Sequence, residues 1–168
     1  DGITGTAIVS EGLREMDVSV VPYLPHRVSE GHGLSSESVQ QLVSQGVSLI
    51  ITVDCGVTSV AEVAEAKQSG ADVIITDHHT PPATSPNAIA IINPKIAGNQ
   101  YPFGDLCGAG IAFKLMQGLY QYYGQAWSPA LIELAALGTI ADLVPLVDEN
   151  RFLVRHGLIE LAQTQRPG

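Results

Sequence analysis

The chain has 168 residues, of which 45% are hydrophobic, and a mean hydropathy of +0.20, so it carries enough apolar material for the core of one compact domain. Its 17 acidic and 8 basic residues give a formal charge of −9, which argues against a domain that grips nucleic acid through its own positive charge. The two cysteines, Cys55 and Cys107, argue against a disulfide framework or a thiolate zinc site, and we interpret both as buried thiols. The absence of a long apolar run or a leader-like start predicts a soluble, cytoplasmic protein with no membrane contact.

The first half of the chain alternates short β-rich runs with amphipathic stretches, which is typical of a parallel α/β sheet. The chain opens on a glycine turn followed by a predicted helix over Ile3–Arg14, so we expect the strand that feeds this turn to lie upstream of residue 1. With that strand, the sheet would have about five strands flanked by helices. The other strands are predicted at Val18–Tyr23, Val47–Val53, Ala71–Thr76 and Ala88–Ile92, and the helices between them at Ser36–Gln45 and Ser59–Gln68.

The second half is predicted to be helical. A connector rich in proline and glycine follows Asn93-Pro94 and leads to helices over Gly108–Tyr123, Ser128–Ile140 and about Asn150–Gln163. Ser128 is expected to be an N-cap, with Pro129 in the first helical position. The chain ends in what we interpret as the start of a connector to a further domain.

Polar side chains follow the apolar strands, where open parallel sheets gather their ligands. Asp54 ends one strand and Asp77-His78-His79 ends the next, while Asp1 precedes the glycine turn and Asp142 lies between apolar neighbours. Carboxylates and imidazoles without paired thiolates favour Mn²⁺ or Mg²⁺. Two such ions can generate a hydroxide for an in-line displacement at phosphorus, so the pattern predicts phosphoester hydrolysis. The alternative is that these residues are helix caps or surface groups at strand ends.

Two further segments are candidates for contact with a substrate phosphate. Arg27, beside His26 in a loop, is a candidate bidentate donor, and the alternative is a solvated loop in which Gly31 and Gly33 supply the turns. Gly108 and Gly110 begin a helix, so their backbone N–H groups are candidates for a phosphate site, or the small residues serve close packing.

Five ordered motifs give the chain a resemblance to a known family over nearly its whole length. It resembles the DHH phosphoesterases, which the triplet Asp77-His78-His79 names, and within them the RecJ-type exonucleases. The other motifs are Pro25-His26-Arg27 with Glu30-Gly-His-Gly-Leu34, Thr52-Val-Asp-Cys-Gly-Val57, Leu106-Cys-Gly-Ala-Gly-Ile-Ala-Phe-Lys114 and Leu137-Gly-Thr-Ile-Ala-Asp-Leu-Val-Pro-Leu146.

The resemblance implies a DHH catalytic domain over residues 1–147, with residues 148–168 forming a helix and the start of a connector to an absent DHHA1-type domain. It implies catalytic roles for Asp77, His78 and His79, and two Mn²⁺ or Mg²⁺ ions held by Asp1, Asp54, His78, His79 and Asp142. Asp77 is expected to orient the histidine pair rather than to be a primary ligand. The family's first motif is D-x-D-G, of which Asp1-Gly2 matches only the second half, so one ligand would lie upstream.

The implied activity is that of a hydrolase acting on phosphodiester bonds, a 5′-to-3′ exonuclease on single-stranded DNA in repair and recombination. Single-strand-binding protein or a helicase would be its partners, and the activity of this piece alone stays open. Two alternatives remain. One is an oligonucleotide or cyclic-dinucleotide phosphodiesterase, or a pyrophosphatase, of the same superfamily. The other is a non-catalytic scaffold subunit, although such relatives typically lose metal ligands that are retained here.

Overall fold

The computed structural model describes residues 1–28 and 30–166. They form two compact units, which we describe separately. The sheet unit comprises Tyr23–Tyr101, and the helical unit comprises Asp1–Pro22 together with the chain from Pro102 onward. Among the described residues, no helix is long and apolar enough to cross a bilayer.

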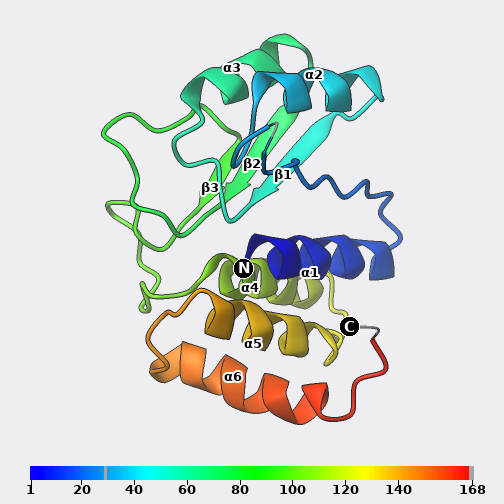
Figure 1. Ribbon diagram of the computed structural model, residues 1–168, viewed down its shortest axis with the longest axis vertical. Coiled ribbons are helices and arrows are strands. Elements are labelled where there is room, and N and C mark those ends of the chain that lie inside the picture. Colours follow the sequence, from blue (N-terminus) through cyan, green and yellow to red (C-terminus); the bar gives the residue numbers. More distant parts are fainter. Residues whose placement is uncertain (29, 167–168) are drawn as a thin grey trace. The chain divides into compact units, whose positions relative to one another are not determined.

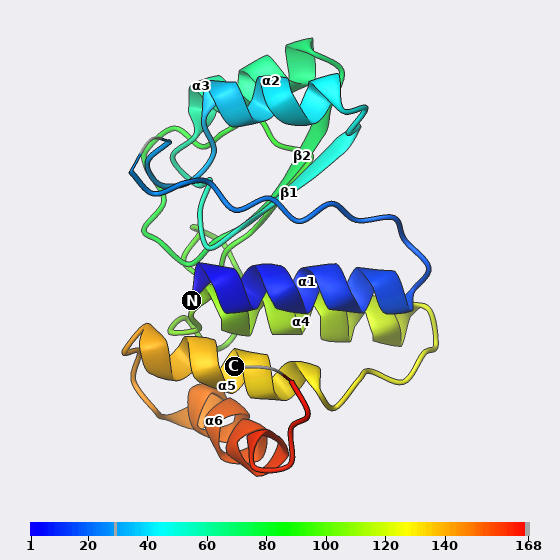
Figure 2. The ribbon, with the colours of Figure 1, turned by 45° about the vertical axis from the view of Figure 1, so that its right-hand side comes forward.

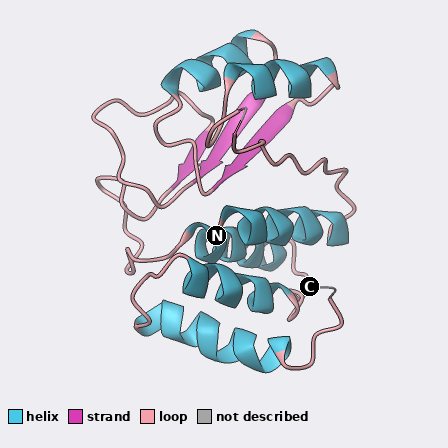
Figure 3. Ribbon diagram, viewed as in Figure 1, coloured by secondary structure: helices cyan, strands magenta, loops and turns pink. Residues whose placement is uncertain are grey.

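The sheet unit is built on three parallel strands in the order β1-β2-β3 (Figure 3). The strands are β1 (Leu49–Val53), β2 (Asp72–Thr76) and β3 (Ala90–Ile92). In the register Val53 pairs with Thr76 and Thr76 with Ile92, so all three strands end at the same edge. The residues that follow each strand are therefore placed side by side.

Two helices, α2 (Ser36–Ser44) and α3 (Val60–Gln68), lie on the same face of this sheet (Figures 1 and 2). Ser35 begins α2 with a reciprocal capping box, in which its side chain accepts the Ser38 N–H and the Ser38 hydroxyl accepts the Ser35 N–H. The core between helices and sheet is apolar, which explains why the strand sequences are almost wholly hydrophobic. Its buried members are Val39, Leu42, Ile50, Val63, Ala66, Ala71, Val73 and Ile75.

The helical unit packs α1 (Gly2–Glu15), α4 (Gly108–Tyr122), α5 (Leu131–Ala141) and α6 (Asp148–Leu161). Helix α1 lies along α4, and both contact α5, which in turn contacts α6 (Figure 2). Helix α5 is apolar around most of its circumference because it is enclosed by these neighbours. The C-terminal segment returns to this bundle through Arg166, which pairs with Glu11 of α1 and with the buried Glu133 of α5.

The α/β class with a parallel, helix-flanked sheet is confirmed, but the described sheet has three strands rather than about five. The strand predicted at Val18–Tyr23 is wrong, because the described structure gives this segment no ladder partner. Val18 and Val21 are 46% and 61% exposed, so the β-branched side chains do not enter a core. The strand expected upstream of residue 1 stays a prediction.

The start of α5 also differs from the prediction. Ser128 and Pro129 belong to a turn, in which their carbonyl groups accept the N–H groups of Leu131 and Ile132, and the N-cap is Ala130. A serine before a proline is a frequent helix start, but here the chain makes one further turn first.

The predicted boundary between residues 147 and 148 does not coincide with the division into units, because α6 belongs to the helical unit. The extent of the catalytic domain therefore stays a prediction. Of the predicted connector, Pro167 and Gly168 lie outside the described residues. Cys107 is buried as expected, whereas Cys55 is only partly buried.

Close packing of α5 on α6 at Gly157 gives the first testable prediction. A Cβ atom at Gly157 would be 2.4 Å from the Cβ of Ala136 and 2.4 Å from the carbonyl oxygen of Ile132. Gly157→Ala should therefore lower the free energy of unfolding in urea by about 1–3 kcal/mol. Gly118→Ala is the matched control, because its Cβ in α4 would meet nothing within 4 Å. The control should raise the free energy of unfolding by up to about 1 kcal/mol, and equal stability of the two variants would contradict this packing.

Candidate metal centre

The carboxyl ends of β1 and β2 bring three of the predicted ligands together. Asp54 follows β1, and His78 and His79 follow β2. Each of the three offers a ligand atom, and these atoms lie within 4.8 Å of one another. This donor set of one carboxylate and two imidazoles suits a hard or borderline divalent cation.

Asp54 is turned into place by a strained backbone. Its φ is +61°, in the left-handed region that a non-glycine residue adopts at a cost of about 1–2 kcal/mol, and its N–H donates to Thr76 O at 3.0 Å. Gly56, two residues later, has φ +108°, and a Cβ there would lie 2.6 Å from the Oγ1 of Thr52. That hydroxyl donates to the Cys55 carbonyl at 2.8 Å, so the turn after β1 requires a glycine at position 56.

Asp77 is the buried anchor of the site, with 1% of its surface exposed. Its Oδ1 accepts the backbone N–H groups of His78 at 2.8 Å and His79 at 3.1 Å, and faces the His79 Nδ1 at 2.7 Å. Its Oδ2 accepts the Val57 N–H at 2.9 Å. Burial alone would raise the pKa of Asp77, but the hydrogen bonds from His79 and Val57 outweigh it and lower this pKa below its ordinary value. Asp77 is therefore an ionised carboxylate whose oxygens are engaged by the protein.

This contact determines how His79 is presented. With Nδ1 donating to Asp77, Nε2 is the nitrogen left for a metal, which is the usual arrangement of a carboxylate behind a ligating histidine. The His79 side chain is 59% exposed, whereas that of His78 is 11% exposed. The His78 Nε2 lies 3.0 Å from Oδ1 of Asp54.

Asn93 supports the same site from the end of β3 and was missed by the sequence analysis. It is buried, and its side-chain amide donates to the His79 carbonyl at 2.9 Å. Its Oδ1 accepts the Lys95 N–H at 2.8 Å. The signal was present, because Asn93 directly follows a strand, as Asp54 and Asp77 do.

Cys55 directly follows Asp54 in the turn after β1. Burial, followed by the negative charges of Asp77 and Asp54, raises the pKa of the Cys55 thiol to about 11 in the metal-free chain. The thiol is therefore protonated at neutral pH when no metal is bound.

Asp1 is fixed separately, within the helical unit. Its two carboxylate oxygens accept the backbone N–H groups of Gly108 and Ala109, each at 2.7 Å, at the N-terminus of α4. The Gly110 N–H donates to the Sγ of Cys107 at 3.3 Å. The amides that were candidates for a phosphate are thus engaged within the fold, and a role of Gly108 and Gly110 in substrate binding stays a prediction.

Asp142 lies at the C-terminal end of α5, where its N–H donates to the Gly138 carbonyl at 2.9 Å. Gly138 packs closely beside Asp1: a Cβ there would be 2.4 Å from that of Ala109 and 3.1 Å from the Oδ1 of Asp1. The motif around Asp142 therefore needs its glycine so that α1, α4 and α5 can approach one another. The metal roles of Asp1 and Asp142 stay predictions.

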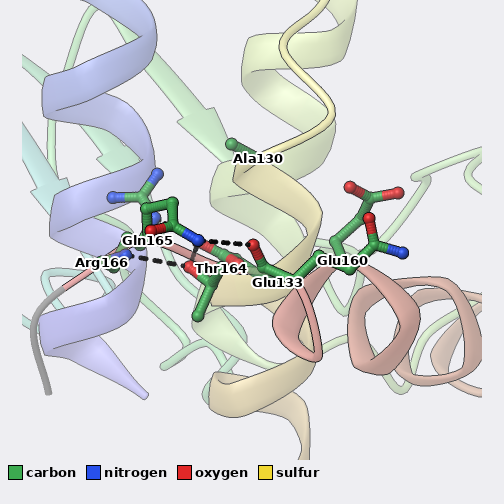
Figure 4. Close-up of a pocket in the computed structure, with 7 residues that line it drawn as sticks. Ala130, Glu133, Glu160, Thr164, Gln165 and Arg166 are labelled. Carbon is green, nitrogen blue, oxygen red and sulfur yellow. Dashed lines mark hydrogen bonds and ion pairs between the residues drawn. The ribbon is translucent and has the colours of Figure 1, made fainter.

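A hollow of about 600 Å³ lies elsewhere in the helical unit (Figure 4). Its described lining includes Glu133, Thr164 and Arg166 but none of the predicted site residues. The Thr164 hydroxyl donates to Glu133 at 3.1 Å, so the buried carboxylate is compensated by the C-terminal segment. The sequence analysis missed this arrangement, whose partners are far apart along the chain.

The saturated Asp77 carboxylate yields a second prediction, made for the metal-free chain. In Asp77→Asn an NH₂ group would face N–H donors, leaving buried donors without an acceptor, so unfolding should become easier by about 2–4 kcal/mol. Asp72→Asn, the same change at an exposed position in β2, should alter stability by less than about 0.5 kcal/mol. Chemical denaturation in a chelating buffer gives the free energy of unfolding of each variant. Similar values for both would show that the hydrogen bonds of Asp77 do not stabilise the fold.

Comparison with known proteins places this geometry in a family. The chain is 45% identical over 168 residues to the single-stranded-DNA-specific exonuclease RecJ of Bacillus subtilis, and it spans 21% of that relative's length. It superposes with a TM-score of 0.84 and 40% identity on exonuclease RecJ bound to manganese, covering 93% of this chain and 40% of that one. RecJ of Thermus thermophilus in complex with Mn²⁺ gives a TM-score of 0.82 and 36% identity, covering 98% of this chain and 23% of that one. Residues 1–139 match the DHH family, N-terminal domain, and the chain therefore belongs to the DHH family.

Proposed function

We propose that this chain is the DHH catalytic domain of a RecJ-type, metal-dependent phosphodiesterase that removes nucleotides from single-stranded DNA in the 5′-to-3′ direction. The observation that carries the proposal is the Asp77 carboxylate behind His79, with His78 and Asp54 beside it. The similarity to RecJ proteins, over the whole of this chain and about a fifth of one curated relative's length, supports the substrate.

The proposed metal ligands are Asp1, Asp54, His78, His79 and Asp142, which would hold two ions of Mn²⁺ or Mg²⁺. Two observations support a metal here. The three sheet-unit donors of this chain converge, and Asp77 supports His79 while the left-handed turn supports Asp54. The RecJ structures that the chain resembles were solved with manganese.

When bound, such ions would lower the pKa of a water molecule and stabilise the charge that develops on the phosphate. The protein's own part is to orient and support the ligands. Asp77 holds the His79 Nδ1 proton, so that the lone pair of Nε2 points away from the carboxylate. Asn93 fixes the His79 backbone, and the buried carboxylate of Asp77 keeps both histidines on one rigid turn. Pre-organised ligands need no rearrangement at the moment of reaction.

Substrate contact is proposed for His26 and Arg27, both exposed in a loop of the sheet unit. A guanidinium can bind a phosphate with two parallel hydrogen bonds. Because the chain's charge is −9, this local cation and the metal ions would have to attract the strand. We also propose that the protein acts in the cytoplasm and works with repair proteins such as a single-strand-binding protein or a helicase.

A second candidate function is phosphodiester hydrolysis of small substrates, such as short oligonucleotides or cyclic dinucleotides. It would use the same ligands. The convergence of Asp54, His78 and His79 disfavours a scaffold that lacks catalysis, because a scaffold has no need of supported ligands.

Metal binding gives a third prediction. His79→Ala should weaken Mn²⁺ binding in calorimetry by at least about 10-fold, because a ligand is lost rather than only its support. His156→Ala is the matched control: this histidine is exposed on α6, where its Nδ1 contacts the Phe152 carbonyl. The His156→Ala protein should bind Mn²⁺ with the same affinity as the unchanged protein. Equal affinity of both variants would remove His79 from the ligand set.

Substrate class gives a fourth prediction. With Mn²⁺, the protein should release nucleotides from the 5′ end of labelled single-stranded DNA, and a cyclic dinucleotide in tenfold excess should compete poorly. Efficient competition by the dinucleotide would favour the small-substrate alternative, and release from the 3′ end would contradict the proposed 5′-to-3′ direction. Metal binding without hydrolysis of either substrate would favour the scaffold.

A further inference from the structure

The loop that carries His26 and Arg27 is closed by a carboxylate that the proposed chemistry does not use. The side chain of Glu30 accepts the backbone N–H of His26 at 3.1 Å, while the Glu30 N–H donates to the His26 carbonyl at 2.8 Å. The hydroxyl of Tyr23 donates to the other carboxylate oxygen of Glu30. Glu30 is therefore tied to His26, directly before Arg27, and to Tyr23.

This tip is exposed and contributes little to the core. Arg27 is exposed, and 89% of the surface of Val28 is accessible. An exposed loop with few apolar contacts would ordinarily sample many conformations, because little opposes its conformational entropy. The hydrogen bonds of Glu30 restrict the conformations that the loop can adopt at His26.

The same loop leads directly to the candidate metal centre. Gly33, three residues after Glu30, has φ +86°, and a Cβ there would be 3.5 Å from the Cβ of Cys55. Cys55 follows Asp54, one of the proposed metal ligands. The loop thus reaches the edge of the sheet at which a phosphate would be attacked.

The negative charge of Glu30 is by itself unfavourable for binding DNA. A carboxylate in a loop that contacts a polyanion repels it, and the hydrogen bond from Tyr23 together with that from the His26 N–H lowers the pKa of Glu30 and keeps it ionised. Its two oxygens are directed at protein donors, which indicates a structural task within the loop.

We propose that Glu30 is a positioning residue, which acts through Arg27: its hydrogen bonds with His26 hold the neighbouring Arg27 so that the guanidinium meets a backbone phosphate of single-stranded DNA. This inference rests on the proposed function, since it assigns to Glu30 a role in binding the proposed substrate. Tyr23 contributes to the same positioning, because its hydroxyl donates to the Glu30 carboxylate.

Removal of the Glu30 carboxylate has two effects of opposite sign on the affinity for DNA. Loss of a negative charge alone would strengthen binding to DNA, whereas loss of the support should weaken it. We expect Glu30→Ala to raise the Kd for a 5′-phosphorylated, labelled oligothymidylate about 10-fold in fluorescence anisotropy, and Glu30→Gln, which keeps an acceptor oxygen, to restore most of the affinity. Asp72→Ala removes an equal charge from the exposed start of β2 and should leave the Kd unchanged or slightly lower.

A double-mutant cycle tests whether Glu30 acts through Arg27. If it does, Glu30→Ala should add almost nothing to the effect of Arg27→Ala. Additive effects, or tighter binding by Glu30→Ala, would overturn the proposal. Calorimetry with Mn²⁺ should give the same affinity for Glu30→Ala and the unchanged protein, and a loss of metal binding would overturn it too.

Failure of the proposed function would look different. If the unchanged protein binds Mn²⁺ but no oligonucleotide, the substrate assignment fails, whatever Glu30 does. Hydrogen exchange then still tests the loop: the His26 amide should exchange faster in Glu30→Ala than in Asp72→Ala, since its acceptor is lost. Equal exchange in the two variants would overturn the support by Glu30.

Discussion

The structure of the candidate site depends on one buried carboxylate, that of Asp77. Desolvation penalises an ionised group of this kind unless donors surround it, and Asp77 meets three backbone N–H groups and one imidazole nitrogen. One donor comes from Val57 after β1 and the others from the turn after β2. The carboxylate therefore ties two neighbouring loops together and sets the direction of the His79 ring. Parallel pairing in register is what brings those loops to the same edge.

In the helical unit, too, an aspartate is held by backbone N–H donors. Asp1 accepts two backbone N–H groups at the N-terminus of α4, where the helix dipole also favours a negative charge. The glycine at Gly138 lets the helices approach closely enough for this contact. In both units an aspartate of a sequence motif is held by N–H donors from a different motif. Val57 of one motif thus supports Asp77 of another, and the start of α4 supports Asp1.

Much of this arrangement could be predicted from the sequence, because apolar strands followed by polar residues identify the ligand edge of a parallel sheet. The rule placed Asp54, His78 and His79 correctly beside one another and, had it been applied to β3, would have found Asn93. Periodicity could not show that Val18–Tyr23 lacks a strand partner, since pairing is a tertiary property. Nor could it reveal Glu30 or the Arg166 contacts with Glu11 and Glu133, which depend on where side chains meet after folding.

The central claim is that Asp77 fixes the His79 ring with its proton on Nδ1, so that Nε2 is free to bind a cation. The tautomer of His79, determined by long-range ¹H–¹⁵N correlation in the metal-free protein with a neutral ring, tests this arrangement. We predict a protonated Nδ1 and an unprotonated Nε2 in the unchanged protein, with the preference lost in Asp77→Asn. A protonated Nε2 in the unchanged protein would contradict it, because the nitrogen left for the metal would already carry a proton.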